Sequence, residues 1–152
     1  MYQMGSCCSD EGDYKTASEY WTKAAALGEV GAHYQLSVMY SEGVGVEKDK
    51  KKGVYHLEQA AIGGDPDGRH NLGVIENDNG RYERAAKLFI IAAKLGCDNS
   101  LDALKGGFKG GIVTKDDLTA ALHGHQAAID AAKSPQRDAA EAVCKFIGER
   151  RN

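Results

Sequence analysis

The five histidines have the widest chemical range in this sequence, because imidazole can bind a metal or transfer a proton near neutral pH. They are His33, His56, His70, His123 and His125. No two of them stand in the HExxH arrangement that places two ligands and a base on one helix face. We therefore expect packing or surface histidines, with no metal site and no catalytic residue.

The cysteines and a glycine-rich segment give no stronger sign of chemistry. The cysteines are irregularly spaced, without a Cys-x-x-Cys pair, at Cys7, Cys8, Cys97 and Cys144. A zinc site is not expected from this spacing. Adjacent cysteines rarely form a relaxed disulfide, so we expect reduced thiols and favour a cytoplasmic chain. The segment 106–111 matches neither a P-loop nor a dinucleotide fingerprint, so no cofactor is expected.

Composition narrows the class of protein. The chain has 152 residues, of which 42% are hydrophobic, and only 2 prolines. This balance suits a folded unit better than a low-complexity linker. The formal net charge of −3 provides no broad basic surface for a phosphate backbone, so nucleic acid is not an expected partner. No stretch approaches the ~20 apolar residues of a membrane span.

A repeated pattern of small residues shows how the chain is organised. Two alanines, followed three residues later by a glycine, occur three times at spacings of 36 and 32 residues. The three sets are Ala24, Ala25 and Gly28; Ala60, Ala61 and Gly64; and Ala92, Ala93 and Gly96. Two further registers keep the same spacings: Ala32, Gly68 and Ser100, and Leu36, Leu72 and Leu104. A looser fourth copy runs from Asp116 to Ala128.

Each unit is expected to be a pair of antiparallel helices. Apolar and small residues recur at helical spacing on both sides of the glycine, without period-two alternation. The glycine is expected to end the first helix in a left-handed cap. Small residues inside the first helices are expected to let stacked helix pairs approach closely; these are Ala17, Gly53, Ala85 and Ala120. The predicted fold class is therefore all-α, an α-solenoid.

The run Gly43–Val46, followed by Asp49 and then by Ala60 and Ala61, resembles the Sel1-like repeat, a relative of the tetratricopeptide repeat. The resemblance covers most of the chain and implies a right-handed superhelix. The loop at 79–80 lacks the GxGV element. Where the family has tryptophan in the first helix, the resemblance places packing residues at Tyr20, His56, Leu88 and His123. The closing stretch 133–137 resembles expanded sets of Sel1-like proteins in algae such as diatoms.

The expected organisation has six parts. Residues 1–12 are predicted to be the tail of a truncated preceding repeat, because Met1–Gly5 is similar to Met39–Gly43. Repeats are expected at 13–48, 49–80 and 81–115, the first helix of a degenerate fourth repeat at 116–133, and a C-terminal capping helix at 134–152. Ser134 before Pro135 predicts the start of that cap. Its apolar stripe would be Ala139, Val143, Phe146 and Ile147.

The expected function is a non-catalytic protein–protein interaction scaffold or adaptor. Stacked helix pairs curve, so the first helices are expected to line a concave face that binds a peptide or a helix. The candidate contact residues are Glu19, Lys23, Tyr55, Gln59, Lys87, Ile90 and Ile91. The run 88–91 spans the whole circumference of its helix, so Ile90 or Ile91 is expected to be an exposed anchor.

Two alternatives stay open. In the first alternative, the chain is a structural segment of a larger Sel1-repeat adaptor whose binding site lies in other repeats. Its N-terminal end would then favour a homodimer through Tyr2, Met4, Tyr14 and Trp21. The second alternative, implied by resemblance alone, is a hydrolase of the cysteine-rich Sel1-like type. The irregular cysteine positions weigh against it, because those relatives carry a regularly spaced pair in each repeat.

Overall fold

The computed structural model describes residues 1–149, with the backbone alone for residues 137, 140, 141 and 144–149. Over that part the chain is helical and has no strand. The helices are α1 (Tyr2–Asp10), α2 (Tyr14–Ala26), α3 (Val30–Glu42), α4 (Lys50–Ile62), α5 (Pro66–Asp78), α6 (Tyr82–Lys94), α7 (Asp98–Lys109) and α8 (Lys115–Glu149). Each helix packs against the next in the chain, and α6 also packs against α8. The predicted all-α repeat fold is confirmed.

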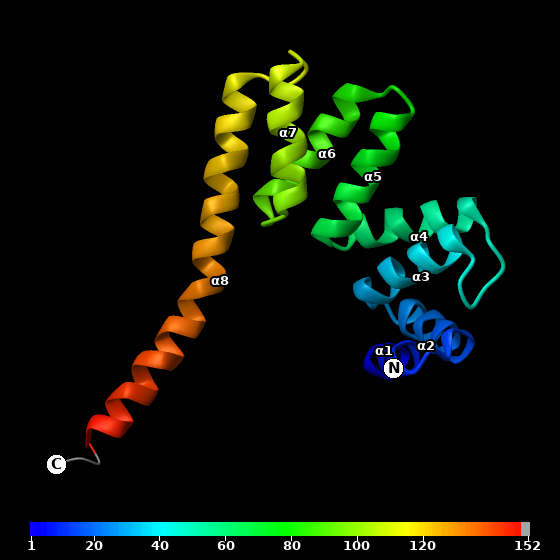
Figure 1. Ribbon diagram of the computed structural model, residues 1–152, viewed down its shortest axis with the longest axis horizontal. Helices are drawn as coiled ribbons and strands as arrows, with labels where there is room; N and C mark the ends of the chain where they lie inside the picture. Colours follow the sequence, from blue (N-terminus) through cyan, green and yellow to red (C-terminus); the bar gives the residue numbers. More distant parts are fainter. Residues whose placement is uncertain (150–152) are drawn as a thin grey trace.

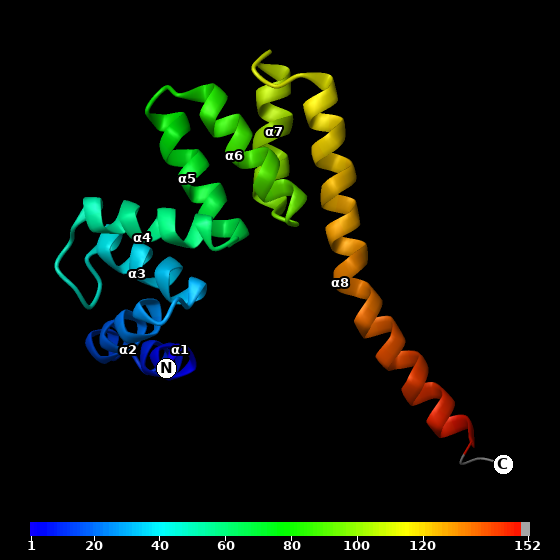
Figure 2. The same ribbon diagram turned by 180° about the vertical axis from the view of Figure 1, so that it is seen from behind.

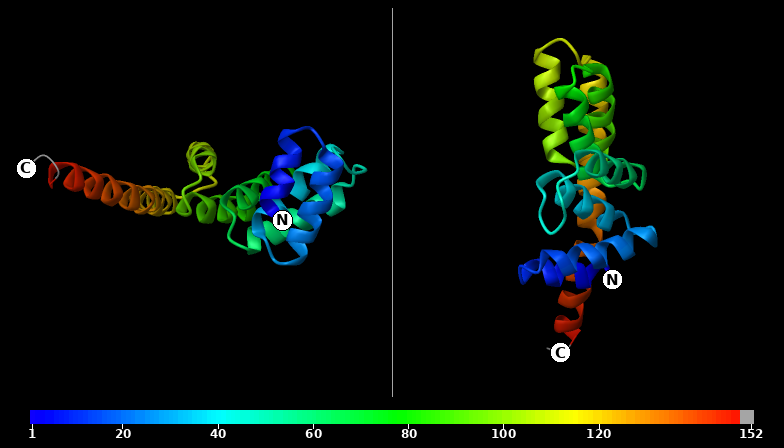
Figure 3. Two further views of the ribbon diagram at one scale, coloured as in Figure 1. Left: turned by 90° about the horizontal axis from the view of Figure 1, so that it is seen from below. Right: turned by 90° about the vertical axis from the view of Figure 1, so that its right-hand side faces the viewer.

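Helices α1 to α7 stack into a solenoid, and α8 runs beside its last turn before projecting away from it (Figure 1). Figure 2 shows the same arrangement from behind, with the two ends of the chain on opposite sides. The left-hand view in Figure 3 shows the C-terminal half of α8 extending away from the other helices. No helix within the described residues is both long and apolar enough to cross a membrane.

The recurrent glycines end α2, α4 and α6 in left-handed caps, as predicted. Gly28 has a φ of +86°, a region that side chains with a Cβ rarely enter. Its N–H donates to the carbonyl of Ala25 at 2.9 Å, and the N–H of Glu29 donates to that of Ala24 at 3.1 Å. The same pair of bonds recurs at Gly64 and Gly96. This cap satisfies the last carbonyls of each helix and turns the chain sharply into the next one.

The large buried residue of each first helix stands one position later than the family resemblance suggested. Trp21, Leu57 and Phe89 are buried, whereas Tyr20, His56 and Leu88 are half-buried. One residue turns an α-helix by about 100°, so this single step separates the core face from the flank. The packing positions expected at 20, 56 and 88 are therefore wrong by one residue.

The expected alignment of the fourth copy is also wrong by one residue. Ala121 is fully buried and His125 is buried, while Ala120, Ala127 and His123 are exposed. The spacing from Ala85 to Ala121 is 36 residues, the same as from Ala17 to Gly53, so the core positions of α8 lie one residue after the expected ones. His125 consequently takes the core position that Trp21, Leu57 and Phe89 hold in α2, α4 and α6.

The expected boundary at Ser134 and Pro135 is wrong, because α8 continues through it. Proline leaves the carbonyl four residues earlier without a helical partner, but Ala131 and Pro135 are exposed, so water can solvate that carbonyl. Alanines on both sides favour helix strongly. The helix changes direction near its middle, as a proline inside a helix explains (Figure 1).

The segment after Pro135 does not cap the solenoid over the residues whose side chains are described. Val143 is 57% exposed, and Ala139 is exposed as well. The side chains of Phe146 and Ile147, and residues 150–152 of the expected cap, lie outside the described part. The described half of the apolar stripe therefore has no partner on the solenoid.

A buried carboxylate holds α5 against α6 where the chain lacks the GxGV loop. Glu76 is buried and accepts two hydrogen bonds from Arg81, to Oε2 at 2.5 Å and to Oε1 at 3.1 Å. Arg84 lies 3.5 Å from the same carboxylate. The hydrogen bond from Arg81 and the charge of both arginines hold the pKa of Glu76 below its usual value. The ion pairs of Glu76 with Arg81 and Arg84 connect α5 to α6, where a longer loop joins α3 to α4.

Close packing explains the glycine inside α4, as expected. A Cβ on Gly53 would lie 2.6 Å from Oγ of Ser41, 3.2 Å from the carbonyl oxygen of Ser37 and 3.3 Å from the amide nitrogen of Ser41. Two of these three atoms belong to the backbone of α3 and cannot turn aside. The absence of a side chain at this position allows α3 and α4 to approach each other.

Gly53→Ala is predicted to lower the free energy of unfolding by about 1 kcal/mol, because the clash with α3 outweighs the higher helix propensity of alanine. The matched control is Gly106→Ala in α7, where an added Cβ meets nothing within 4 Å. That variant should be more stable by up to about 1 kcal/mol. Urea unfolding followed by circular dichroism measures both, and changes of the same sign would contradict this account of Gly53.

Candidate protein-binding site

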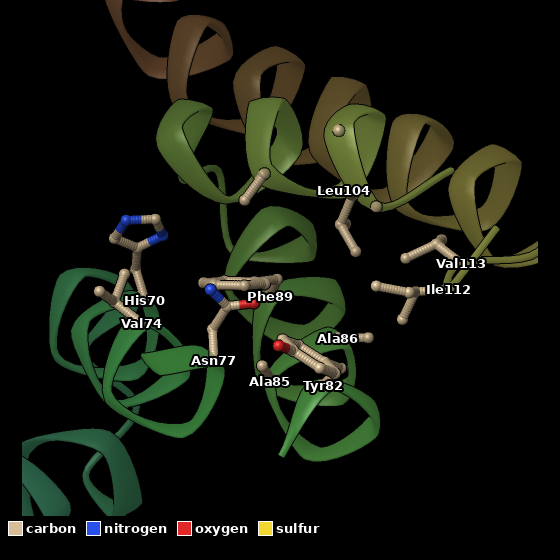
Figure 4. A pocket seen from close by; sticks show the side chains of 13 residues that line it. His70, Val74, Asn77, Tyr82, Ala85, Ala86, Phe89, Leu104, Ile112 and Val113 are labelled. Atoms are coloured by element: carbon tan, nitrogen blue, oxygen red, sulfur yellow. The ribbon is translucent and has the colours of Figure 1, made fainter. Parts of the chain in front are cut away.

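A cavity of about 400 Å³ opens between α5 and α7, with α6 as its floor. Figure 4 shows His70 and Val74 on one side of the opening, Ile112 and Val113 on the other, and Phe89 between them. Most of the lining is apolar. The polar contributions come from His70, Asn77 and Tyr82, and none of the described residues that line the cavity is charged.

Two consecutive glycines in α7 keep the cavity open. By the repeat spacing, Gly106 corresponds to Val38 in α3 and Val74 in α5, and Gly107 corresponds to Met39 and Ile75. Val113 partly fills the space beside Gly107, since an added Cβ there would lie 2.8 Å from Cγ2 of Val113. Nothing fills the space beside Gly106. The third repeat therefore has a cavity where the first two carry large side chains.

His70 and Phe89 form the aromatic wall of the cavity. Their ring centroids are 5.3 Å apart and their planes are tilted by 41°. Nδ1 of His70 lies 2.8 Å from Oγ of Ser100, a residue of α7 that is fully buried. Burial of the imidazole lowers the pKa of His70, and the negative charge of Asp67 only partly offsets this. Ser100 has no access to a substrate, so this pair positions His70 and does not form a nucleophile with its base.

A second depression continues the cavity towards the N-terminus. It lies between α3 and α5 above Leu57, has a volume of about 260 Å³, and shares Val74 with the cavity. Val38, Val74 and Ile112 are 41%, 38% and 47% exposed. The face formed by α3, α5, α7 and the loop after α7 thus presents exposed apolar side chains in successive repeats, and we call it the odd-helix face. Polar side chains, among them Ser41, Glu42 and Asn71, also line its second depression.

The residues predicted as contacts lie on α2, α4 and α6, and none of them lines this cavity. Glu19, Lys23, Tyr55, Lys87 and Ile91 are exposed, whereas Gln59 and Ile90 are half-buried. Of the two candidate anchors, Ile90 packs against the core around Phe89, and Ile91 is 41% exposed. Ile91 lines an apolar depression between α4 and α6, beside Ile62 and Leu88. The structure therefore offers a second, shallower surface at Ile91.

The cavity was missed because its signal was a departure from the repeat. The segment 106–111 matches no nucleotide-binding fingerprint, and the sequence alone therefore gave it no function. Comparison of Gly106 with Val38 and Val74 in the repeat alignment would have indicated a missing side chain. The helix rotation that brings His70 and Phe89 to one wall has no comparable signal in the sequence.

The expected dimer surface at the N-terminal end is only partly available. Trp21 is 3% exposed, because α1 covers it. Its Nε1–H donates to the carbonyl of Tyr2 at 3.2 Å, and Tyr2 itself is half-buried. Met4 and Tyr14 remain 51% and 44% exposed. The expectation that Trp21 contributes to an exposed apolar end is therefore wrong.

Comparison with known families identifies the repeat. The profile of the Sel1 repeat matches residues 1–29, 30–65 and 67–97, which is more than half of the chain. The chain belongs to the Sel1 repeat family. The matched segments begin at α1, α3 and α5, so they are offset by one helix from the repeats expected above. Sel1 repeat proteins generally mediate protein–protein interactions and are typically non-catalytic scaffolds.

Solved structures of Sel1 repeat proteins are similar to this chain. A protective antigen of uropathogenic Escherichia coli strains, described as displaying an SLR fold, is 26% identical with a TM-score of 0.68 over 88% of this chain. A Sel1 repeat protein from Oxalobacter formigenes is 25% identical with a TM-score of 0.69 over 82% of it. The matches span 30% and 56% of those two proteins. No curated protein sequence matches the chain.

Outside the cavity, a pair of histidines joins α3 to α4 in this Sel1 repeat chain. Nδ1 of His33 lies 2.9 Å from Nδ1 of His56, and the ring of His56 stacks on Tyr40 at 5.7 Å. One imidazole must donate and the other accept, so the bond requires at least one neutral ring. Burial lowers the pKa of His56, and the positive charges of His33 and Lys52 lower it further. Among the described residues no cluster of three potential metal ligands is present.

The chain is predicted to lose stability as the pH falls below about 6.5, the ordinary pKa of histidine. The pKa of His56 is lowered in the folded state, so the unfolded state takes up the proton at a higher pH. This proton uptake stabilises the unfolded state relative to the folded state. The loss should continue until the pH passes the lower, folded-state pKa. Thermal unfolding between pH 8 and pH 5 measures it.

The matched variant is His56→Leu. Leucine is the residue at the equivalent position of α6, Leu88. Its melting temperature should change less between pH 8 and pH 5 than that of the native chain. His123→Gln, at an exposed position, serves as the control. An undiminished pH dependence in His56→Leu would contradict the role given to the pair.

Proposed function

We propose that this Sel1 repeat chain is a non-catalytic scaffold that binds a peptide or a helix of another protein on its odd-helix face. The observation that carries the proposal is the open cavity beside Gly106. Each glycine inside a helix costs about 1 kcal/mol relative to alanine. Gly53 is explained by the close approach of α3, but Gly106 has open space beside it. Retaining the cavity for a ligand accounts for this cost.

The chemistry of the lining favours an apolar side chain of a partner. The described lining residues carry no charge, so a charged group entering the cavity would lose its hydration without gaining an ion pair. Interface hot spots are commonly apolar or aromatic anchors in desolvated pockets. Val74, Leu104 and Ile112 supply the contacts that such an anchor needs.

The shape of the odd-helix face supports a helical or extended partner. Two helices, α5 and α7, form the walls of the cavity, and Val74 leads into the second depression between α3 and α5. A helix lying in a groove inserts side chains at positions i, i+3, i+4 and i+7, so successive depressions along one face suit it. The adjacent apolar positions at Val38 and Val74 would extend the contact beyond the cavity.

The surface on α2, α4 and α6 is the second candidate for the same function. Ile91 lies in its apolar depression, and Tyr55 and Lys87 are exposed on the neighbouring first helices. Its depression has a volume of about 380 Å³, and its polar residues vary between repeats as contact residues do. In the structural-segment alternative neither face binds a partner, and the chain spaces other parts of a larger adaptor.

The test is affinity capture from a lysate of the source organism with the native chain and two variants. Gly106→Leu places a side chain in the cavity and should lose the captured protein. The triple variant Tyr55→Ala, Lys87→Ala, Ile91→Glu alters the other face and should retain it. Circular dichroism and urea unfolding establish that both variants fold. The reverse pattern would move the site to the second face, and capture by neither face would favour the structural segment.

A further inference from the structure

A hydrogen bond between two side chains joins the helices that form the walls of the cavity. Nδ1 of His70 in α5 lies 2.8 Å from Oγ of Ser100 in α7. One turn further along each helix, Val74 and Leu104 line the cavity. Ser100 has no exposed surface, so water does not compete for its hydroxyl. This pair, which we call the His70–Ser100 bridge, therefore helps to set the spacing between α5 and α7 beside the cavity.

The buried hydroxyl donates its proton to the imidazole. The buried Ser18 and Ser37 donate to carbonyls of their own helices, whereas Oγ of Ser100 has Nδ1 of His70 as its partner among the described residues. If Nδ1 carried a proton, the hydroxyl proton of Ser100 would be buried without an acceptor, which is unfavourable. An imidazole with a positive charge carries a proton on both nitrogens and has no acceptor. The bridge therefore requires a neutral His70.

We infer that the bridge is pH-sensitive: protonation of His70 breaks it, separates α7 from α5 and weakens binding at the odd-helix face. The last step rests on the proposed function, because it names the regulation of that site. The sequence and packing of α7 favour such a movement. Gly106 and Gly107 lower the stability of its C-terminal half, and its contacts with α8 are sparser than those between α5 and α6. Regions with few packed contacts open before the rest of a protein unfolds.

The surroundings of His70 favour its neutral form. Burial lowers the pKa of His70, and the negative charge of Asp67 in the same helix only partly offsets this. Of the helices packed against the ring, α6 presents the uncharged ring of Phe89 and α7 the uncharged hydroxyl of the bridge. Asp98 of α7 pairs with His125 of α8 instead. Below about pH 6.5, the ordinary pKa of histidine, the opened state takes up the proton more readily, so acidification favours opening until the pH passes the lower pKa of the closed state.

The experiment compares amide hydrogen exchange of the full chain at pH 8 and pH 5, corrected for the intrinsic rates, and titrates His70 by NMR. Protection of the amides of α7 should fall at least about 5-fold at pH 5, as the loss of one buried hydrogen bond provides. Protection in α2, at the other end of the solenoid (Figure 1), should fall less. The pKa of His70 should rise towards its ordinary value in Ser100→Ala, because the hydroxyl that bonds to the neutral ring is then absent.

The matched variant His70→Phe, Ser100→Ala removes the imidazole and the hydroxyl together, so that no buried polar group is left unpaired. Its α7 should lose no more protection at pH 5 than its α2, and circular dichroism establishes that it folds. His56→Leu removes the histidine contact between α3 and α4 and should keep the response of α7. An equal response in the double variant overturns the inference. If that variant does not fold, an unchanged pKa of His70 in Ser100→Ala, which introduces the residue of the equivalent Ala32, overturns it.

Capture of the partner at two pH values separates this inference from the proposed function. The native chain should retain the captured protein at pH 8 and release it at pH 5, whereas the double variant should hold it at both. Release by both chains overturns regulation through the bridge. The proposed function fails when Gly106→Leu still captures the protein, whether or not α7 responds to pH.

Discussion

The close approach of helix backbones at alanine and glycine is the constraint on which the rest of the molecule depends. Ala24, Ala60 and Ala92 have no exposed surface, and each lies one turn before a left-handed cap. A larger side chain at these points would push successive helices apart. Because the helices meet here, the larger side chains of each helix pair have fixed positions, and the gaps between them are defined as well.

The cavity is a local exception to this packing. The first two repeats place valine, methionine or isoleucine where α7 has Gly106 and Gly107. Phe89 gains room for its ring in a similar way, because a Cβ on Gly73 would lie 2.7 Å from Cε1 of that ring. Small residues thus have two uses in this chain. At Gly53 they bring helices together, and at Gly106 they leave space that the chain itself does not fill.

The parts of the fold that follow from local periodicity were predictable from the sequence. The three alanine pairs and their glycines predicted the helix ends and the caps at Gly28, Gly64 and Gly96. The resemblance to the repeat family came from the run Gly43–Val46 with Asp49, Ala60 and Ala61. Rotation about the helix axis was less predictable, since a one-residue error exchanges Trp21 for Tyr20. The alignment predicted for the fourth copy was wrong by one residue as well. Pro135 predicted a helix start, but the exposure of the preceding turn, which makes the proline tolerable, depends on tertiary structure.

The candidate site was harder to predict than the fold, because it depends on pairs far apart in the sequence. His70 and Ser100 are 30 residues apart, and neither residue alone indicates a cavity. Most of the variable positions predicted on the first helices are exposed. Exposure at Glu19 or Lys87, however, does not distinguish a residue that contacts a partner from one that faces solvent. A repeat alignment identifies the residues that recur, whereas the cavity lies where Gly106 and Gly107 depart from the repeat.

The packing also divides the chain into regions that respond separately to change. One core surrounds Trp21 and Leu36, and another surrounds Phe89 and Leu104. Between them α4 and α5 form the connection, since each helix packs mainly on its neighbours in the chain. Mutations around Trp21 can therefore accumulate with little effect on the walls of the cavity. Sequence change in the N-terminal helices and sequence change in the C-terminal helices are therefore largely independent.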